Sequence, residues 1–383
     1  MQDKGLSKKA VMAELKKALQ EDQRYDEGRI LCSMCTKPNA LAKKAHELFL
    51  NSNLGDSGLF PGSARLEKEV IRELAGLLNG VGSVGFLVSG GTEANLLALL
   101  AARNMAQIDK PEVVLPESAH FSFDKICGLL GLKAVYAGLD GSFRVDVSAV
   151  EKLVGKNTVA IVGSAGTSEL GVVDPIGKLS EVARAHGVWL HVDAAFGGLV
   201  IPFLEDFCCP FDFGLEGVQS VTVDPHKMGM APVPAGGILF RNSKALDYIK
   251  TETPYLTDGF QYTFVGTRTG ASAAATWAVF KSLGREGFKK TVANCMKTTG
   301  ALRDGIVNLG FDLVVEPTLN ILAFRGQNSK LLAEELRRKG WFVSYVPRLN
   351  CIRIIVMPHV KKMHAVAFLK DLSEIAEADK KKL

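Results

Sequence analysis

Between residues 84 and 240, short apolar runs that favour β-structure alternate with runs of helical pattern, and glycine or proline residues separate them. Strands that are apolar throughout are typical of a parallel sheet covered on both faces. Alternation of such strands with helices predicts an α/β domain with a largely parallel sheet. The fold class predicted for this part of the chain is therefore α/β.

The same patterns predict the bounds of individual elements. Strands are expected at residues 84–88, 112–115, 134–136, 158–163, 189–192, 220–223 and 237–240, and later at 341–346 and 351–357. Helices are expected at residues 40–50, 65–78, from 92, from 121, within 145–154, at 175–186, 271–283, 331–339 and from 362. A Gly/Thr-rich segment at residues 251–270 interrupts the alternation.

The chain length favours more than one lobe. A chain of 383 residues is longer than one compact core usually supports. We predict an N-terminal arm over residues 1–62, a large domain over 63–283 and a small α/β C-terminal domain over 284–383. Apolar residues at 47% and charged residues at 23% are ordinary for a globular protein.

Charge and hydropathy argue against nucleic-acid and membrane partners. The formal net charge is +5 and the lysines are scattered, apart from Lys380-Lys381-Lys382, for which we expect a frayed, solvated tail. No run approaches the ~20 apolar residues that span a bilayer. The N-terminus reads as a polar amphipathic helix, with Val11, Leu15 and Leu19 at helical spacing, and lacks the apolar core of a signal peptide. A cytoplasmic location is therefore expected.

The cysteine pattern favours thiols over disulfides or metal. Seven cysteines, an odd number dispersed over a long chain, argue against a disulfide framework. Cys32-Ser33-Met34-Cys35 has the spacing of zinc ribbons and redox enzymes, but no second C-x-x-C or H-x3-H pair completes a zinc site. The vicinal pair Cys208-Cys209 has poor geometry for a bridge. We expect buried thiols and no metal site.

Two β-prone runs each deliver one charged group at the end of a strand. The run from Val221 to Gly229 carries Lys227, and the earlier run from His191 to Gly198 carries Asp193. A lysine amine can condense with the aldehyde of pyridoxal 5'-phosphate (PLP), and a carboxylate can hold the pyridine nitrogen protonated so that the ring accepts electrons. Lys227 alone would prove little, because most lysines are solvated surface groups. The two runs together predict a PLP enzyme.

A glycine-rich turn precedes these runs. Ser89 to Asn95 lies between an expected strand and an expected helix, where Gly91 allows close backbone approach to a phosphate and Thr92 adds a hydroxyl. Such turns are common in α/β folds, and this one fails as a dinucleotide loop of the G-x-G-x-x-G type. Ahead of Asp193 and Lys227, it predicts a phosphate site.

Two further polar residues follow expected strands. An imidazole at His120 could lie flat against a cofactor ring, or it could be a loop histidine with a satisfied hydrogen bond. The hydroxyl of Thr167 could reach the phenolic oxygen of the ring or the Asp193 carboxylate. Equally, the turn at Thr167 could be a helix N-cap.

With these motifs in place, the chain resembles the group II PLP-dependent amino-acid decarboxylases of fold type I, and among them the archaeal L-tyrosine/L-aspartate decarboxylases. The likeness covers essentially the whole chain: Gly28–Thr36, Asn53–Phe60, Ser89–Asn95, Ala119–Phe123, Gly163–Gly171, His191–Pro202, Asp224–Gly229, Leu283–Gly287 and Arg353–His359. It implies a mostly parallel seven-stranded sheet in the large domain, PLP as cofactor and a homodimer with its active site at the subunit interface.

The resemblance also implies roles for individual residues. Lys227 would bond to the cofactor aldehyde, Asp193 would partner the pyridine nitrogen, His120 would stack on the ring and Ala195 would pack beneath it. The other cofactor-binding residues would be Gly91, Thr92, Thr167, Asp224, His226 and, from the neighbouring subunit, Thr267.

On the substrate side, Arg353 would bind the α-carboxylate, and Asn53 and Asp56 would meet the side chain. The segment from Thr253 to Tyr262 has the glycine and proline hinges of a closing lid. Tyr255 in this segment is the candidate proton donor to the α-carbon, with His226 or a lysine as alternatives.

The leading hypothesis is decarboxylation of L-tyrosine to tyramine, of L-aspartate to β-alanine, or both, and the resemblance implies that these products feed methanofuran and coenzyme A biosynthesis. The alternative is a carbon–carbon lyase of the sphingosine-phosphate lyase type, although no lipid-facing segment is evident. A cofactor-free scaffold would have lost Lys227, Asp193 or His120, and all three are present. A nicotinamide-dependent dehydrogenase lacks its fingerprint here.

Overall fold

The computed structural model describes residues 1–205 and 207–380 of the chain. Of the lysines expected to form a frayed tail, Lys380 ends the last helix, whereas residues 381 and 382 lie outside the described residues. Within the described part, no helix is both long enough and apolar enough to cross a bilayer.

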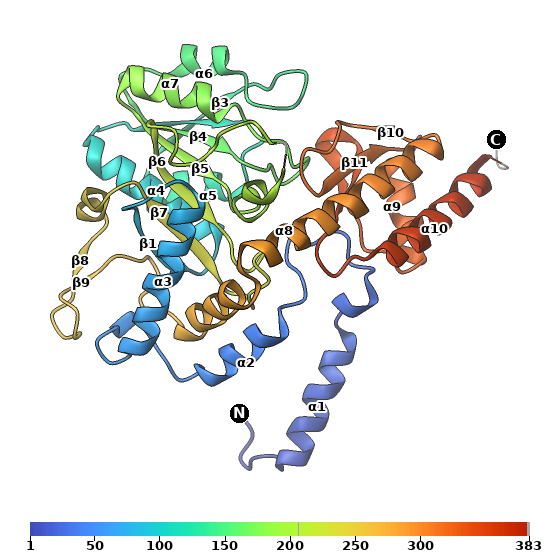
Figure 1. Cartoon of the computed structure of the whole chain (residues 1–383), viewed down its shortest axis with the longest axis horizontal. Coiled ribbons are helices and arrows are strands. Elements are labelled where there is room, and N and C mark those ends of the chain that lie inside the picture. Colours follow the sequence, from blue (N-terminus) through green and yellow to red (C-terminus); the bar gives the residue numbers. More distant parts are fainter. Residues whose placement is uncertain (206, 381–383) are drawn as a thin grey trace.

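A seven-stranded sheet forms the centre of the molecule (Figure 1). Its strands run in the order β1-β7-β6-β5-β4-β2-β3, and only β7 is antiparallel to its neighbours. The predicted, largely parallel α/β sheet is therefore confirmed. The strand bounds are β1 Val84–Val88, β2 Glu112–Pro116, β3 Lys133–Ala137, β4 Thr158–Ser164, β5 Trp189–Asp193, β6 Val218–Val223 and β7 Gly236–Phe240.

Helices cover both faces of this sheet. Residues of the sheet enter two separate apolar cores, one on each face, because successive side chains on a strand point to opposite faces. One core contains α4 and α5, and the other contains α3, α7 and the first half of α8. The helix bounds are α3 Pro61–Leu77, α4 Gly91–Ala106, α5 Ser122–Leu130, α6 Val147–Leu153, α7 Ile176–His186 and α8 Gly270–Asn308.

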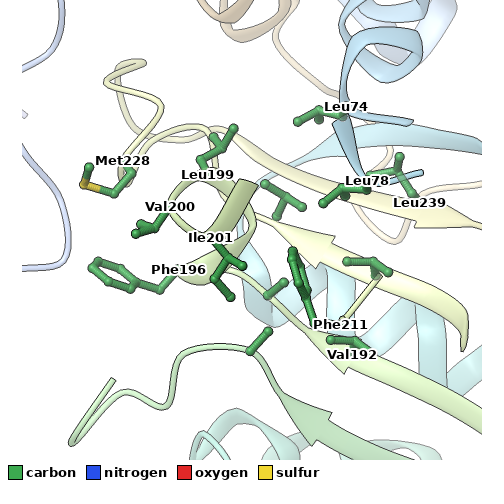
Figure 2. Close-up of a cluster of buried hydrophobic side chains, with 14 of the residues drawn as sticks. Leu74, Leu78, Val192, Phe196, Leu199, Val200, Ile201, Phe211, Met228 and Leu239 are labelled. Atoms are coloured by element: carbon green, nitrogen blue, oxygen red, sulfur yellow. The ribbon is translucent and has the colours of Figure 1, made fainter. Parts of the chain in front are cut away.

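The core on the α3 side packs tightly against the sheet. Figure 2 shows Leu74 of α3, Leu78 at the C-terminal end of that helix and Leu239 of β7 near one another, above Val192 of β5. Phe196 joins this cluster from the segment that follows β5. These five side chains are each at most 2% exposed.

The helix α8 leads from the large sheet to a second, smaller sheet (Figure 1). A break at Gly284, with φ of 56°, interrupts α8 where the sequence predicted a helix end. The small sheet is antiparallel in the order β10-β11-β13-β12 and packs against α9 and α10. Its elements are β10 Asp312–Leu313, β11 Ile321–Arg325, α9 Ser329–Arg338, β12 Ser344–Val346, β13 Cys351–Ile355 and α10 Lys362–Lys380.

The first sixty residues contact the rest of the chain unevenly. Helix α1 (Lys8–Glu21) buries no residue and extends away from the body in Figure 1, whereas α2 (Ala40–Leu48) packs on α8. Between them, Leu31 donates its N–H to the carbonyl of Phe342 beside the small sheet. The short strands β8 (Thr251–Glu252) and β9 (Phe260–Gln261) form a hairpin in the Gly/Thr-rich segment. Short 3-10 helices occupy Tyr25–Glu27, Leu54–Asp56, Gly197–Leu199, Ile201–Phe203, Ser243–Tyr248 and Pro347–Leu349.

The thiols are less uniformly buried than expected. Cys127, Cys295 and Cys351 are buried, as predicted. Cys208 and Cys209 are exposed, so the prediction is wrong for this pair. They lie in an irregular stretch between Phe203 and β6, outside the packed elements.

Substituting Leu74 by Ala tests the packing of α3 on the sheet. Leu74 is fully buried, so we expect the change to lower the free energy of unfolding by about 2–5 kcal/mol. Urea unfolding measures the loss. Lys68→Ala, at an exposed position on the same helix, is the matched control and should change stability by less than about 0.5 kcal/mol. Equal unfolding midpoints for the two variants would contradict this packing.

Candidate active site

A cavity of about 360 Å³ lies at the carboxyl ends of the central strands. Residues that follow β1, β2, β4, β5 and β6 line it, because parallel strands deliver their carboxyl ends to one edge of the sheet. Nine of the residues predicted from sequence line this cavity: Gly91, Thr92, His120, Thr167, Asp193, Ala195, Asp224, His226 and Lys227.

The Lys227 amine meets a buried carboxylate. Its Nζ lies 3.2 Å from Oδ2 of Asp224, which is 2% exposed. The other carboxylate oxygen, Oδ1, has no hydrogen-bond partner among the described residues. His226 Nδ1 accepts the N–H of Ala235 at 3.1 Å, and its Nε2 lies 3.6 Å from Asp224 Oδ2. Burial lowers the pKa of His226, which keeps the ring neutral at neutral pH.

Asp193 lies at the end of β5 and accepts two hydrogen bonds. The Asn95 side-chain amide donates to Oδ2 at 3.0 Å, and the backbone N–H of Ala195 donates to Oδ1 at 3.1 Å. Donors of this kind stabilise the ionised form of a carboxylate.

His120 and Thr167 approach the cavity from the ends of β2 and β4. His120 Nδ1 lies 2.9 Å from the Ser122 hydroxyl and accepts the Ser122 N–H at 3.3 Å, so the ring lines the cavity and is also satisfied locally. Burial lowers its pKa. Thr167 Oγ1 accepts the N–H of Val172 at 3.2 Å within a turn. No helix begins there, so the helix N-cap alternative for Thr167 is wrong.

The glycine-rich turn opens α4 toward the cavity. In the described residues, no side chain caps this helix at Gly90, so the positive end of its dipole faces the cavity. Backbones approach closely here: a Cβ on Gly236 would lie 2.4 Å from the Cα of Gly90. A Cβ on Gly91 would meet Asp224 Oδ2 at 3.1 Å and the Ala195 methyl group at 3.2 Å.

Five predicted residues do not line the cavity. Arg353 lies beside it, with one Nη donating to the carbonyl of Ser168 and the other to the carbonyl of Cys32, while its Nε is buried without a partner in the described chain. The other four lie in or near the β8–β9 segment: Tyr255, Thr267, Asn53 and Asp56.

Several contacts hold the β8–β9 segment, residues 251–270, to the rest of the chain, and two of them involve carboxylates beside the cavity or in the arm. Asp56 Oδ1 accepts the N–H of Thr257 at 3.1 Å. Glu93 accepts the N–H groups of both Ser89 and Val265, at 2.8 and 3.0 Å, and so joins the glycine-rich turn to the base of the segment. Thr267 lines a separate cavity of about 200 Å³ beside Ser89 and Glu93. Tyr255 is 85% exposed.

Comparison with known proteins decides the family. The model of the pyridoxal-dependent decarboxylase conserved domain matches residues 40–327. The chain belongs to this family. A "Probable L-tyrosine/L-aspartate decarboxylase" of Methanothermobacter thermautotrophicus is 52% identical over 92% of this chain and 98% of that protein. An "L-aspartate decarboxylase" of Thermococcus kodakarensis is 49% identical over 98% of this chain and 99% of that protein.

Solved structures carry the same fold. The sphingosine-1-phosphate lyase of Burkholderia pseudomallei superposes with a TM-score of 0.91 at 29% identity, covering 98% of this chain and 92% of that one. The predicted resemblance to the PLP-dependent decarboxylases is therefore confirmed, and with it PLP as the cofactor.

The cavity fits the cofactor of this family. PLP needs an amine for its aldehyde, a carboxylate for its pyridine nitrogen and an anion site for its phosphate. Lys227, Asp193 and the uncapped start of α4 supply these three groups around one cavity. The unpartnered Oδ1 of Asp224 leaves a further polar atom that a bound ligand can satisfy.

Sequence reasoning missed part of the cavity wall. Met34, Ser118, Ser164, Ser168 and Phe196 line it without having been assigned a role. Met34 lies in the arm, far from the others in sequence, so only tertiary contact brings it here. Ser118 follows β2 and Ser164 ends β4. Their position at strand ends, close in sequence to His120 and Thr167, was the one signal that could have identified them.

The Asp174 carboxyl group binds the backbone of Ser164 on the cavity wall, and its pKa is raised. It is 1% exposed and accepts the N–H groups of Val145 and Ser164, each at 2.8 Å. Burial raises its pKa from 3.8 to about 6. Because the folded-state pKa is the higher one, this group's contribution to stability is present below about pH 4 and lost as the pH rises through about 6.

We therefore expect the Asp174 carboxyl carbon to show a titration midpoint near 6 in 13C NMR. Asp174→Asn removes this carboxyl group, so loss of the resonance in that variant is the control for its assignment. A midpoint at the ordinary value of 3.8 would contradict the assignment of Asp174 as a desolvated acid.

Proposed function

We propose that this chain decarboxylates L-tyrosine to tyramine, L-aspartate to β-alanine, or both, with release of CO2. The observation that carries the proposal is the convergence of Lys227, Asp193 and His120 on one cavity at the strand ends. The substrates are proposed from two relatives, whose names specify L-tyrosine/L-aspartate and L-aspartate. That tyramine and β-alanine from this reaction feed methanofuran and coenzyme A biosynthesis stays a prediction.

Each cofactor-facing residue has a physical part in this proposal. PLP, when bound, supplies a ring that accepts the electron pair left behind by departing CO2. Lys227 would hold the aldehyde carbon, and Asp193, with its two donors, would face the pyridine nitrogen as an anion. The half-buried ring of His120 would lie over one face, and Ala195, which is 7% exposed, would pack against the other.

The remaining cofactor contacts follow from position. Gly91, Thr92 and His226 would bind the phosphate where α4 begins. Asp224 would hold the Lys227 amine in place through the contact of 3.2 Å before the cofactor binds. Thr167 would reach the phenolic oxygen, because its turn places it on the same cavity as Asp193.

On the substrate side, Arg353 would bind the α-carboxylate through its unpartnered Nε, next to Ser168 on the cavity wall. Tyr255 would donate the proton to the α-carbon, and Asn53 and Asp56 would meet the substrate side chain. All three lie in or beside the β8–β9 segment and not on this chain's own cavity, so they would act when the segment closes or in a neighbouring subunit's site.

A homodimer is part of the proposal, with Thr267 completing the phosphate site of the neighbouring subunit. Its support on this chain is α1, which buries no residue yet exposes Val11, Leu15 and Leu19 at helical spacing. An isolated helix of 14 residues is marginal in water, and an apolar stripe of this kind is stable when it is covered.

A second candidate is a PLP-dependent carbon–carbon lyase. The observation that favours it is the likeness to the sphingosine-1-phosphate lyase of Burkholderia pseudomallei at 29% identity. Identities of 52% and 49% to the two decarboxylase relatives weigh more heavily. Release of an aldehyde from a phosphorylated sphingoid base, without CO2 from any amino acid, would favour the lyase.

Product analysis tests the activity directly. The PLP-loaded protein is given L-tyrosine, L-aspartate and L-glutamate separately, and amines and CO2 are quantified. We expect tyramine, β-alanine or both, and a loss of product in Lys227→Ala of at least about 10⁴-fold, the scale on which loss of a covalent catalytic group is measured. Lys178→Ala, at an exposed position on α7, should retain full activity.

Amine formation that survives Lys227→Ala would contradict the assignment of the catalytic lysine. Absence of amine from all three amino acids would contradict the decarboxylase proposal.

Light scattering tests the dimer. We expect a mass of two chains for the unmodified protein. Leu15→Asp with Leu19→Asp places two charges on the apolar stripe of α1 and should weaken association, because each desolvated charge costs several kcal/mol. Lys16→Asp with Lys17→Asp adds the same number of carboxylates to neighbouring exposed lysine positions of the helix and is the control. A monomeric mass for the unmodified protein would overturn the proposal.

A further inference from the structure

A chain of buried polar side chains leads from the core of the large domain to Asp193. Its five members are each at most 3% exposed: Asn95, Trp189, His191, Ser220 and Thr222. They come from α4, β5 and β6. The parallel register sets His191 beside Ser220 and Asp193 beside Thr222, and these side chains share the face of the sheet that α4 covers.

The charge on Asp193 determines the direction of the hydrogen bonds nearest to it. An ionised carboxylate only accepts, so the Asn95 amide presents its NH2 group to Asp193 and its oxygen to His191. His191 Nε2 must then donate to Asn95 Oδ1, at 3.0 Å. Burial lowers the pKa of His191 to about 4, so the ring is neutral and its Nδ1 is an acceptor.

The remaining bonds continue in the same direction. Ser220 Oγ lies 2.8 Å from His191 Nδ1 and donates to it. The indole of Trp189 can only donate, and it does so to Ser220 Oγ at 2.8 Å. Thr222 adds a second donor to Asn95 Oδ1 at 2.7 Å. Every hydrogen in the chain therefore points toward Asp193.

An aligned chain of this kind acts on the carboxylate as well as on packing. Hydrogen bonds in a low-dielectric interior polarise one another, so aligned donors strengthen the last bond, from Asn95 to Asp193. Besides the chain itself, the charged or titratable groups that share the cavity with Asp193 are His120, Asp224, His226 and Lys227.

We propose that Asn95 and His191 are positioning residues whose aligned hydrogen bonds keep Asp193 ionised and oriented toward the pyridine nitrogen. The inference rests on the proposed role of Asp193. With the chain broken, the carboxyl group would retain a proton that otherwise resides on the pyridine nitrogen, and the ring would accept electrons less well.

Two substitutions at residue 191 separate this role from packing. His191→Gln keeps a donor that can reach Asn95 Oδ1, whereas His191→Phe keeps a ring of similar shape but has no donor. Asn95→Leu removes the final donor at nearly constant volume. Each variant is loaded with 15N-labelled PLP, and the 15N resonance of the pyridine nitrogen reports whether that nitrogen is protonated.

We expect the unmodified holoenzyme and His191→Gln to show the protonated resonance at neutral pH. His191→Phe and Asn95→Leu should move it toward the unprotonated position, with kcat lower by about tenfold to a hundredfold and KM little changed, the scale of a lost hydrogen bond to a charged group. An unmoved resonance in folded, loaded His191→Phe and Asn95→Leu would overturn the proposal.

Two further variants complete the test. Thr222→Val removes one hydroxyl donor at constant volume and is used if His191→Phe and Asn95→Leu do not fold. A smaller shift of the 15N resonance in the same direction would support the proposal, and the absence of a shift would overturn it. Asp193→Asn tests the premise. If the 15N resonance is unmoved in Asp193→Asn, the proposed role of Asp193 itself is wrong. If the resonance moves in Asp193→Asn but in none of the other variants, only the inference about Asn95 and His191 is wrong.

Discussion

The parallel pairing of β4, β5 and β6 is the constraint on which the rest of this structure depends. Their register aligns Ser164 with Asp193 and Asp193 with Thr222, so the residues after each strand emerge at one edge of the sheet. The chain continues from these ends to Thr167, Ala195 and Lys227 and encloses a single cavity. A register change of one residue would turn Asp193 to the other face of the sheet.

Negative charge at this edge is compensated in three different ways. Asp174 accepts two backbone N–H groups and is left as a weak acid. Asp224 faces the Lys227 ammonium group at 3.2 Å. Asp193 accepts an amide and a backbone N–H, and behind that amide lies the chain that begins at Trp189. The three carboxyl groups therefore lie in three different environments at one edge of the sheet.

Two parts of the chain outside the two larger sheets expose apolar or aromatic side chains. Helix α1 exposes an apolar stripe, and the β8–β9 segment exposes Tyr255 while Glu93 holds its base and Asp56 its hairpin loop. The exposed stripe is the surface on which the proposed dimer rests, and Tyr255 is the residue that the proposed function would bring to a cavity. Arg353, tied to the carbonyl groups of Ser168 and Cys32, links the arm and the small sheet to the same cavity.

The sequence by itself determined the central sheet and nine of the residues around the cavity, because strand periodicity, glycine turns and strand-end polar groups are local signals. The expected strands lie within two residues of β1 to β7, and Lys227, Asp193 and the start of α4 line one cavity. Tertiary structure alone decided what depends on contacts distant in sequence. Met34 on the cavity wall, β11 in the small sheet and the alignment of Asn95 with His191 are of this kind, since no local pattern specifies which buried polar group another one will meet.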